Sequence, residues 1–267
     1  FHAHPDDEAI ATGGSMARAH TDGHRVVLIV ATNGEHGEVP DDLAAGEALA
    51  DRRRAETERS GKALGADRIV WLGYSDSGMS GWDANDHDHS FWQADLDEAA
   101  GRVADVLREE RADVFTIYDW HGNYGHPDHV QVHRVGCRAE QMVAHDLPGL
   151  RVFEATMNRD AMRRQIQMAR EAGQSFGPVD GDDFDPDSPM DDGNPMGTPE
   201  AELTMMVDVS AFVASKREAI GAHRSQVSDS SFFMAMPPDA FTMAFGTEWF
   251  IEHGVEPGMR SGWLFEP

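Results

Sequence analysis

The stretch His4-Pro5-Asp6-Asp7-Glu8, within FHAHPDDEAIATGG (residues 1–14), places two histidines and three carboxylates in the first eight residues. The residues before His4 are typical of the end of a strand. Pro5 followed by acids is typical of the first turn of a helix, where carboxylates complement the helix dipole. A helix start needs fewer acids than this, and three adjacent carboxylates repel one another. The stretch therefore predicts a strand-to-helix turn, with a metal site as the alternative to a simple helix cap.

Strand and helix signals alternate along the rest of the chain. Apolar runs typical of strands buried on both faces cover residues 26–30, 69–72, 114–118 and, more weakly, 152–156. Helices are expected at about 8–21, 42–65, 95–110 and 128–146, then at 159–173 and 210–224, with a further strand at 203–207. This alternation predicts an α/β fold, a Rossmann-like three-layer sandwich around a mostly parallel sheet with C-terminal additions.

A second polar cluster, YDWHGNYGHPDH (residues 118–129), follows the fourth strand. In an open parallel sheet, ligands bind beyond the carboxyl ends of the strands, where the strand order reverses. If the residues before His4 are strand one and the order is 3-2-1-4-5, strands one and four are neighbours at that reversal. The two polar clusters are therefore expected to share one crevice.

The side chains of this crevice suit a divalent metal. Zinc takes imidazole and carboxylate ligands, and a catalytic zinc site keeps one position open for water or substrate. His4 and Asp7 are close enough around the turn to bind one ion, and a histidine of the second cluster would complete the set. Chemistry alone leaves open which histidine that is, because His126, His129 and His133 could all reach inward from one helix face.

Asp6 and His126 are the candidates for proton transfer. A zinc-bound water has a pKa near about 7, and a carboxylate beside it can take its proton as the water attacks a carbonyl. Asp6, left unligated, would be that base. His126, oriented by Asp128, would stabilise the developing oxyanion or protonate the leaving amine.

Composition limits the class of protein. One domain over residues 1–267 is expected, with an Asp/Gly/Pro-rich insert at about 178–199 that forms either an ordered lid or a tether. The formal net charge of -26 argues against nucleic acid as a partner. A single cysteine, Cys137, excludes an internal disulfide, and no apolar run approaches the roughly 20 residues of a membrane span. We expect a soluble, cytoplasmic protein, and composition does not decide whether it forms a homo-oligomer.

The two clusters also carry a family resemblance. AHPDDE (residues 3–8) with GHPDH (residues 125–129) resembles the PIG-L/LmbE superfamily of zinc-dependent N-acetylglucosaminyl deacetylases, which includes mycothiol-type enzymes. NGEHGE (33–38), RRAE (53–56) and LGYSDSGM (72–79) fit the same family order, so the resemblance extends from residue 2 to about residue 226.

Carried over position by position, the resemblance implies that His4, Asp7 and His129 bind zinc, and that His133 lies outside the ligand set. It implies that Asp6 is the general base, with His126 as the electrostatic or acid partner oriented by Asp128. The substrate would meet Tyr124 at its scissile carbonyl, and at its sugar or aglycone it would meet Arg53, Asp76, Met79 and Glu38.

HRSQ (residues 223–226) resembles an H-x-S-Q element found late in such proteins. His223 and Gln226 are therefore candidates for the rim of the substrate pocket, although both residues would also serve as a polar helix cap. The aromatic side chains of Trp82, Trp92 and Trp120 could stack on a sugar ring, but a core position is the more common outcome for such residues.

The predicted function is a zinc-dependent hydrolase that removes an acyl group, in particular acetyl, from an N-acylated amino sugar or glycoconjugate. A small-molecule substrate is thus the expected partner. An amidase acting on thiol S-conjugates is the nearest alternative. A non-haem iron oxygenase is a second one, since two histidines and a carboxylate also bind Fe²⁺, but that site needs no adjacent carboxylate base.

Overall fold

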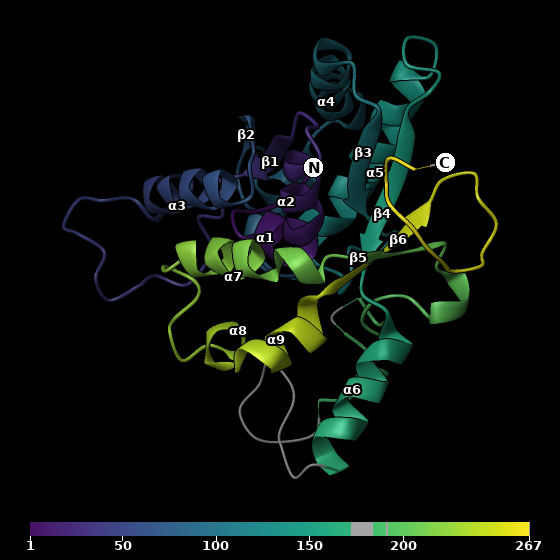
Figure 1. Cartoon of the computed structure of the whole chain (residues 1–267). Helices are drawn as coiled ribbons and strands as arrows, with labels where there is room; N and C mark the ends of the chain where they lie inside the picture. Colours follow the sequence, from purple (N-terminus) through teal and green to yellow (C-terminus); the bar gives the residue numbers. More distant parts are fainter. Residues whose placement is uncertain (172–183, 191, 267) are drawn as a thin grey trace.

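The computed structural model describes residues 1–171, 184–190 and 192–266 (Figure 1). Its α-helices are α1 (Asp7–Ala11), α2 (Gly13–Thr21), α3 (Leu49–Ala63), α4 (Leu96–Glu110), α5 (Pro127–Val143), α6 (Arg159–Glu171), α7 (Val213–Ala222), α8 (Phe232–Ala235) and α9 (Pro238–Phe245). Its strands are β1 (Val27–Thr32), β2 (Arg68–Tyr74), β3 (Val114–Tyr118), β4 (Arg151–Thr156), β5 (Met205–Asp208), β6 (Thr247–Glu252) and β7 (Arg260–Ser261). Among these described residues, no helix is both long and apolar enough to cross a membrane.

Residues 1–3 lie between β1 and β3. β1 pairs in parallel with β2, and His2 forms a parallel bridge with Val30 of β1. The amino group of Phe1 donates a hydrogen bond of 2.9 Å to the carbonyl oxygen of Thr116 in β3. These neighbours agree with the prediction, but β1–β2 and β3–β4 belong to two hydrogen-bonded sheets rather than one. Three residues are too few to carry a full ladder on both sides.

The second sheet has the order β3-β4-β6-β5-β7. β3 and β4 are parallel, whereas β6 is antiparallel to both β4 and β5. The sequence predicted the strand at β5 but neither β6 nor β7, which follow the short helices α8 and α9. The C-terminal segment thus extends the sheet beyond β4.

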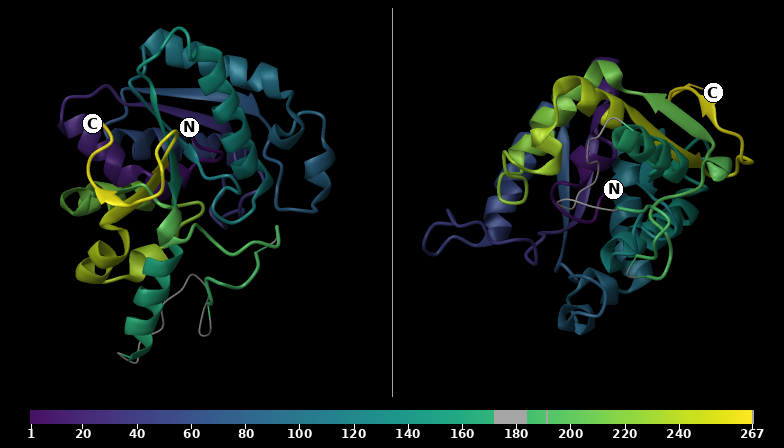
Figure 2. Two further views of the ribbon diagram at one scale, coloured as in Figure 1. Left: turned by 90° about the vertical axis from the view of Figure 1, so that its right-hand side faces the viewer. Right: turned by 90° about the horizontal axis from the view of Figure 1, so that it is seen from below.

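Helices cover both faces of the strands (Figures 1 and 2). The apolar faces of α4 and α5 pack together against Ile29 of β1 and Ile117 of β3. On the other face, Ala19 of α2 packs with Phe153 of β4 and Phe250 of β6. The predicted layering is confirmed, and the loops that follow residues 1–3 and β3 meet at one end of it.

The helix predicted at 8–21 is two helices that meet at Thr12. The hydroxyl of Thr12 lies 2.9 Å from Nε2 of His2, and the carboxylate of Glu248 accepts from the N–H groups of Gly14 and Ser15 at 2.9 Å each. Those two N–H groups lie in the first turn of α2, where a helix has no internal acceptor for them. The carboxylate of Glu248 in β6 therefore stabilises the start of α2, whereas the sequence pattern predicted one continuous helix.

Two other helices begin later in the chain than the sequence predicted. α3 begins at Leu49 rather than near 42, and α7 begins at Val213 rather than at 210. Residues 178–183 and 191 of the predicted insert lie outside the described residues. The described part contacts the loop after β3, because the N–H of Gly197 donates to the carbonyl oxygen of Asn123 at 2.7 Å. Asp192 also lies 3.4 Å from Nδ1 of His121. Whether the insert acts as a lid stays a prediction.

Candidate functional site

A cavity of about 210 Å³ opens where the loop after residues 1–3 meets the loop after β3. Its lining includes many of the predicted site residues, namely His4, Asp6, Asp7, Arg53, Asp76, Met79, Tyr124 and His126. Two clusters far apart in the sequence therefore converge on one cavity, as the topology predicted.

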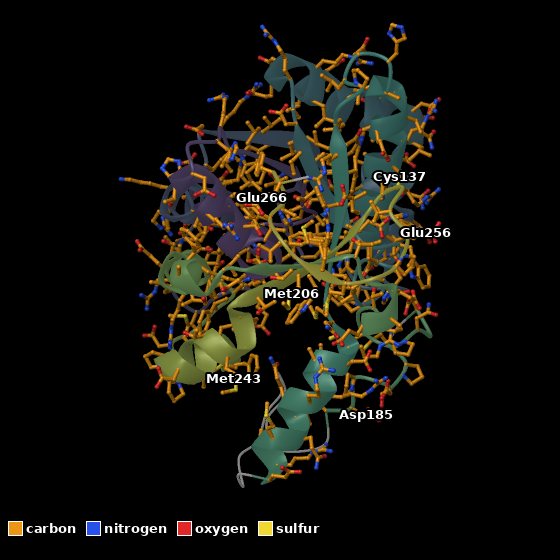
Figure 3. The ribbon with its side chains drawn as sticks, turned by 45° about the vertical axis from the view of Figure 1, so that its right-hand side comes forward. Cys137, Asp185, Met206, Met243, Glu256 and Glu266 are labelled. Atoms are coloured by element: carbon orange, nitrogen blue, oxygen red, sulfur yellow. The ribbon has the colours of Figure 1, made fainter. Side chains whose placement is uncertain are left out.

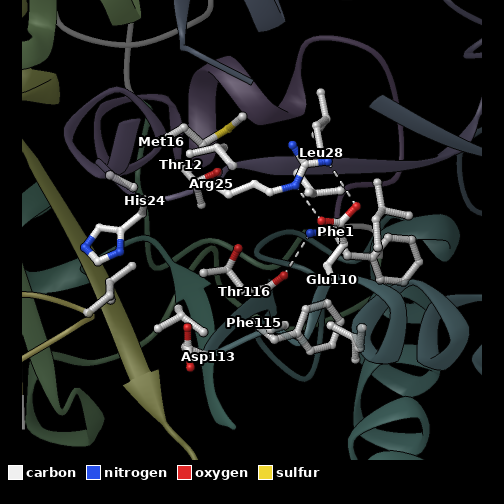
Figure 4. Close-up of a pocket in the computed structure, with 18 of the residues that line it drawn as sticks. Phe1, Thr12, Met16, His24, Arg25, Leu28, Glu110, Asp113, Phe115 and Thr116 are labelled. Carbon is white, nitrogen blue, oxygen red and sulfur yellow. Dashed lines mark hydrogen bonds and ion pairs between the residues drawn. The ribbon is translucent and has the colours of Figure 1, made fainter. Parts of the chain in front are cut away.

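A second hollow of about 210 Å³ lies between β1 and β3 (Figure 4). Phe1 lines it, and an ion pair of 2.6 Å joins Arg25 to Glu110 at its edge. None of the predicted site residues lines this hollow. Of these two cavities, the predicted site residues line only the first.

His4, Asp7 and His129 form a compact group of metal-ligand atoms. Oδ2 of Asp7 lies 3.4 Å from Nδ1 of His4 and 3.3 Å from Nε2 of His129. One ligand atom from each residue lies within 4.8 Å of the others. Two imidazoles and one carboxylate at this separation are a donor set that suits zinc with one position left open.

The two histidines of this group are held by their other ring nitrogens. Nε2 of His4 lies 3.0 Å from Oδ2 of Asp128, and Nδ1 of His129 lies 3.2 Å from the carbonyl oxygen of Gly122. Such outer contacts are typical of metal-binding histidines, because they fix the ring and its tautomer. The residues present therefore fit a divalent metal.

The structure corrects the predicted role of Asp128. Its carboxylate accepts from His4 and from the backbone N–H (2.9 Å) and hydroxyl of Ser77, so it does not orient His126. His126 is held instead by the backbone N–H of Asp128, which donates to its Nδ1 at 3.1 Å. Asp128 does not reach the ring of His126 in this way because its side chain, in the first turn of α5, is directed toward His4.

His126 is poised as a neutral donor. Burial, reinforced by the nearby His4 and His129, lowers the pKa of His126 to about 2. Since Nδ1 accepts a hydrogen bond, the proton of the neutral ring is on Nε2. A ring in this state can donate to an oxyanion in the cavity without itself being charged.

Asp6 has an unusual backbone and a single cationic partner. Its φ is 99° and its ψ is -30°, a conformation rarely adopted by a residue with a side chain. Oδ2 of Asp6 lies 3.1 Å from Nη2 of Arg53, and the N–H of Asp6 donates to Oε2 of Glu8 at 3.0 Å. Burial raises the pKa of Asp6 to about 6, although Arg53 opposes the shift. A carboxylate with such a pKa suits a general base that works near neutral pH.

Arg53 lines the cavity, yet its guanidinium is already occupied by the protein. Besides Asp6, it donates to the carbonyl oxygens of Pro5 (2.5 Å) and Gly34 (2.6 Å). The side chain is 5% exposed. These contacts hold the turn that carries Asp6, and the contact of Arg53 with substrate stays a prediction.

The HRSQ element lies behind the cavity rather than at its rim. His223 is 0% exposed, and its Nε2 lies 2.8 Å from Oε1 of Glu8. Gln226 exchanges hydrogen bonds of 3.0 and 2.9 Å with the backbone of Glu38, which is itself exposed. The predicted pocket-rim role of His223 is wrong, since a fully buried side chain cannot meet a substrate. Gln226 and Glu38 instead fix the loop after β1.

Asp76 and Met79 lie where the sequence predicted them, in the lining of the cavity. Asp76 accepts from the N–H of Gly78 at 2.8 Å and lies 3.6 Å from Nε2 of His4. His4, Asp76 and His126 form a second group of neighbouring ligand atoms. The negative charge of Asp76 beside His4 adds to the attraction for a cation.

Sequence reasoning missed several supports of the site. Ser77 holds Asp128, and no signal in the sequence marked it apart from its place in LGYSDSGM. His2, to which the sequence assigned no role, is 2% exposed, and its Nδ1 lies 2.8 Å from the hydroxyl of Tyr118. The ring of Tyr118 stacks on that of His129, with 4.6 Å between the ring centroids. Position beside the motif was the only hint for His2.

Comparison with known proteins agrees with this geometry. Residues 1–140 match the model of a family described as "PIG-L: GlcNAc-PI de-N-acetylase". A protein of Acidothermus cellulolyticus named "1D-myo-inositol 2-acetamido-2-deoxy-alpha-D-glucopyranoside deacetylase" is 40% identical, over 94% of this chain and 86% of its own length. The chain belongs to the PIG-L family. A Thermomonospora curvata protein of the same name is 35% identical over 98% of this chain and 95% of its own length.

PIG-L membership confirms the predicted family and the predicted class of enzyme, a deacetylase. The fold is confirmed as well. The structure of N,N'-diacetylchitobiose deacetylase from Pyrococcus horikoshii is similar, with a TM-score of 0.60 and 22% sequence identity. The match covers 94% of this chain and 81% of the Pyrococcus chain. At this identity the likeness concerns the fold alone.

Proposed function

We propose that this PIG-L enzyme is a zinc-dependent N-deacetylase whose substrate is a 2-acetamido-2-deoxy-glucopyranoside joined to an inositol. The observation that carries the proposal is that the carboxylates of Asp6 and Asp7 point to different partners. Asp7 faces His4 and His129, whereas Asp6, its neighbour, is turned toward Arg53 and the cavity. A metal-binding carboxylate and a free carboxylate therefore stand side by side.

The residues that would hold the metal are His4, Asp7 and His129. When bound there, a divalent metal supplies Lewis acidity to the amide carbonyl and to the attacking water. Zinc is the metal we propose, because two imidazoles and a carboxylate form a typical catalytic zinc set, and Fe²⁺ is the alternative with the same ligands.

The proton steps are assigned to side chains of the chain itself. Asp6 takes a proton from the water as its oxygen attacks the acetamide carbon. His126 donates from Nε2 to the oxygen of the tetrahedral adduct, and Tyr124, whose hydroxyl lies 3.4 Å from Nε2 of His129, borders the same space. Proton return to the nitrogen then releases acetate and the free amine.

The shape of the cavity supports a small sugar. A volume of about 210 Å³ can hold the acetamido-sugar ring of the proposed substrate. Trp82 lines its mouth and is 50% exposed, so one face of the indole is available to a sugar or its aglycone. The inositol part of the proposed substrate rests on the names of the relatives.

Replacing Asp6 with Asn tests the assignment of the base. We expect hydrolysis of the N-acetylglucosaminyl-inositol to fall by about 10²–10⁴-fold, since the amide cannot accept the proton. Metal content, measured by atomic emission after dialysis, should equal that of the unaltered enzyme. Full activity in Asp6→Asn would overturn the assignment.

A substrate panel tests the reaction itself. Enzyme loaded with zinc or with iron is incubated with N-acetylglucosaminyl-inositol, N-acetylglucosamine and a thiol S-conjugate amide, and the new amines are measured. We expect the fastest release of acetate from the inositol conjugate. Faster turnover of the thiol conjugate would favour the amidase, and uptake of oxygen by the iron form would favour the oxygenase. A cytoplasmic location is part of the proposal, and it rests on the reduced state expected of Cys137.

A further inference from the structure

A second cluster of metal-ligand types lies further along α5. His133 and Cys137 occupy successive turns of this helix, and Glu154 faces them from β4. One ligand atom from each residue lies within 4.8 Å of the others. Cys137 is labelled in Figure 3. None of these residues takes part in the proposed deacetylation.

The separations between ligand atoms match those of a tetrahedral site. Metal–sulfur and metal–nitrogen bonds of about 2.3 and 2.0 Å place neighbouring ligand atoms about 3.3–3.6 Å apart. Sγ of Cys137 lies 3.6 Å from Nε2 and 4.0 Å from Nδ1 of His133, and Oε1 of Glu154 lies 3.4 Å from that Nδ1. The three groups thus stand close to ligand spacing around the imidazole ring.

A supporting histidine comes from the segment after β6. Nε2 of His253 lies 3.0 Å from Oε1 of Glu154, and Nδ1 of His253 lies 2.7 Å from a carboxylate oxygen of Glu140. His253 therefore holds the carboxylate of Glu154, an outer contact of the kind that orients metal ligands. The ring of His133 is held as well, because its Nδ1 lies 3.1 Å from the carbonyl oxygen of Tyr118.

The cluster is distinct from the deacetylase site. Tyr118 lies between the two, since its ring stacks on His129 while its carbonyl oxygen contacts His133. The side chains of His133 and Glu154 are 20% and 12% exposed, so an ion can reach them from solvent. A bound ion would join α5 to β4.

We propose that His133, Cys137 and Glu154 form a second divalent-metal site, of the zinc class, with a structural role, in which His253 holds the carboxylate of Glu154. On binding, the metal forms a bond to Sγ of Cys137, and the thiol proton goes to solvent. The carboxylate of Glu154 and one ring nitrogen of His133 donate lone pairs without a change in oxidation state, and water takes the fourth position. Because the site binds α5, its occupancy stabilises the helix that His126 caps and whose first turn carries Asp128.

Cobalt titration gives a direct test, because Cys137 is the single cysteine of the chain. Metal-free full-length protein is titrated with Co²⁺ and followed by absorption. The deacetylase site has only nitrogen and oxygen donors, so a near-ultraviolet sulfur-to-cobalt charge-transfer band can come only from the proposed site. We expect this band, two Co²⁺ ions per chain, and protection of Cys137 from alkylation by iodoacetamide.

Matched variants separate the two sites. Asp7→Asn should lose the ion of the deacetylase site and keep the charge-transfer band, whereas Cys137→Ala should lose the band and keep deacetylase activity. His253→Gln should weaken the band-forming affinity by about tenfold or more. Absence of the band from the unaltered protein at millimolar Co²⁺, or unchanged alkylation of Cys137, would overturn the proposal whether or not any variant folds.

Discussion

The buried pair Glu8–His223 offers a sharp test of how the site is built. Both side chains are 0% exposed, and they join the start of α1 to the residue that follows α7. Burial alone would lower the pKa of His223, but Glu8 raises it, and His223 in turn holds the pKa of Glu8 below its ordinary value. Each partner therefore favours the charged form of the other, and Nε2 of His223 lies 2.8 Å from Oε1 of Glu8.

Replacing His223 with Ala leaves a carboxylate buried without its cation. Loss of one partner of a buried ion pair lowers the free energy of unfolding by about 3–5 kcal/mol. Oε2 of Glu8 also accepts from the N–H of Asp6, whose positive φ costs about 1–3 kcal/mol that surrounding contacts must offset. Any shift of Glu8 therefore moves the proposed base.

Misplacement of a reacting group by about 1 Å can cost about 10²-fold in rate. We therefore expect His223→Ala to lower kcat by about 10–100-fold with little change in KM, since His223 does not touch the substrate cavity. Urea titration of metal-free protein gives the stability, and acetate release from the inositol conjugate gives the rates at a temperature where the variant is folded.

A double-mutant cycle with Glu8→Gln supplies the control. If the two residues act as a pair, His223→Ala should cost much less stability when Glu8 is already uncharged, with a coupling of about 2–3 kcal/mol. Two outcomes would refute the reasoning. One is additivity within about 0.5 kcal/mol, and the other is a folded His223→Ala variant in which KM rises while kcat is kept.

Three further predictions concern other parts of the molecule. Asp128→Asn should weaken metal binding at the deacetylase site by about 10–100-fold in a chelator competition, because its carboxylate holds a ligand histidine; unchanged affinity would contradict this. Trp82→Ala should raise KM about 2–10-fold at constant kcat. Trp120 is similarly exposed but lies outside the cavity, so Trp120→Ala should leave KM unchanged. Equal KM values for the two variants would show that Trp82 does not stack on the substrate. In metal-free protein, contact with Glu154 raises the pKa of His253 to about 9 from an ordinary value of 6.5. The stability that His253 contributes is therefore full below about pH 6.5 and lost as pH rises through 9, so urea titration should separate His253→Gln from the unaltered protein at pH 6 but not at pH 10.

The strand-to-helix turn and the convergence of the two clusters could be predicted from sequence. Both depend on local pattern and on chain topology, because parallel strands bring their carboxyl ends to one edge. His4, Asp7 and His129 were named on that basis, with the family resemblance choosing His129 over its neighbours. That they bind the metal stays a prediction, which the grouping of their ligand atoms in the structure supports.

The partners of the site residues could not be predicted in this way. Glu8 and His223 are 215 residues apart, and Glu248 starts α2 from β6, a strand that the sequence did not indicate. Such contacts depend on how the C-terminal segment packs, which no local periodicity encodes. The same limit applies to Arg53, because the resemblance placed it near the substrate but gave no sign of its ion pair with Asp6.

The three adjacent acids of the opening stretch are compatible because each has a different partner. Asp7 faces His4 and His129, Asp6 pairs with Arg53, and Glu8 pairs with His223. Arg53 comes from α3 and His223 from the end of α7, so the turn is fixed by two helices that pack on each other. The positive φ of Asp6 is what separates its carboxylate from that of Asp7.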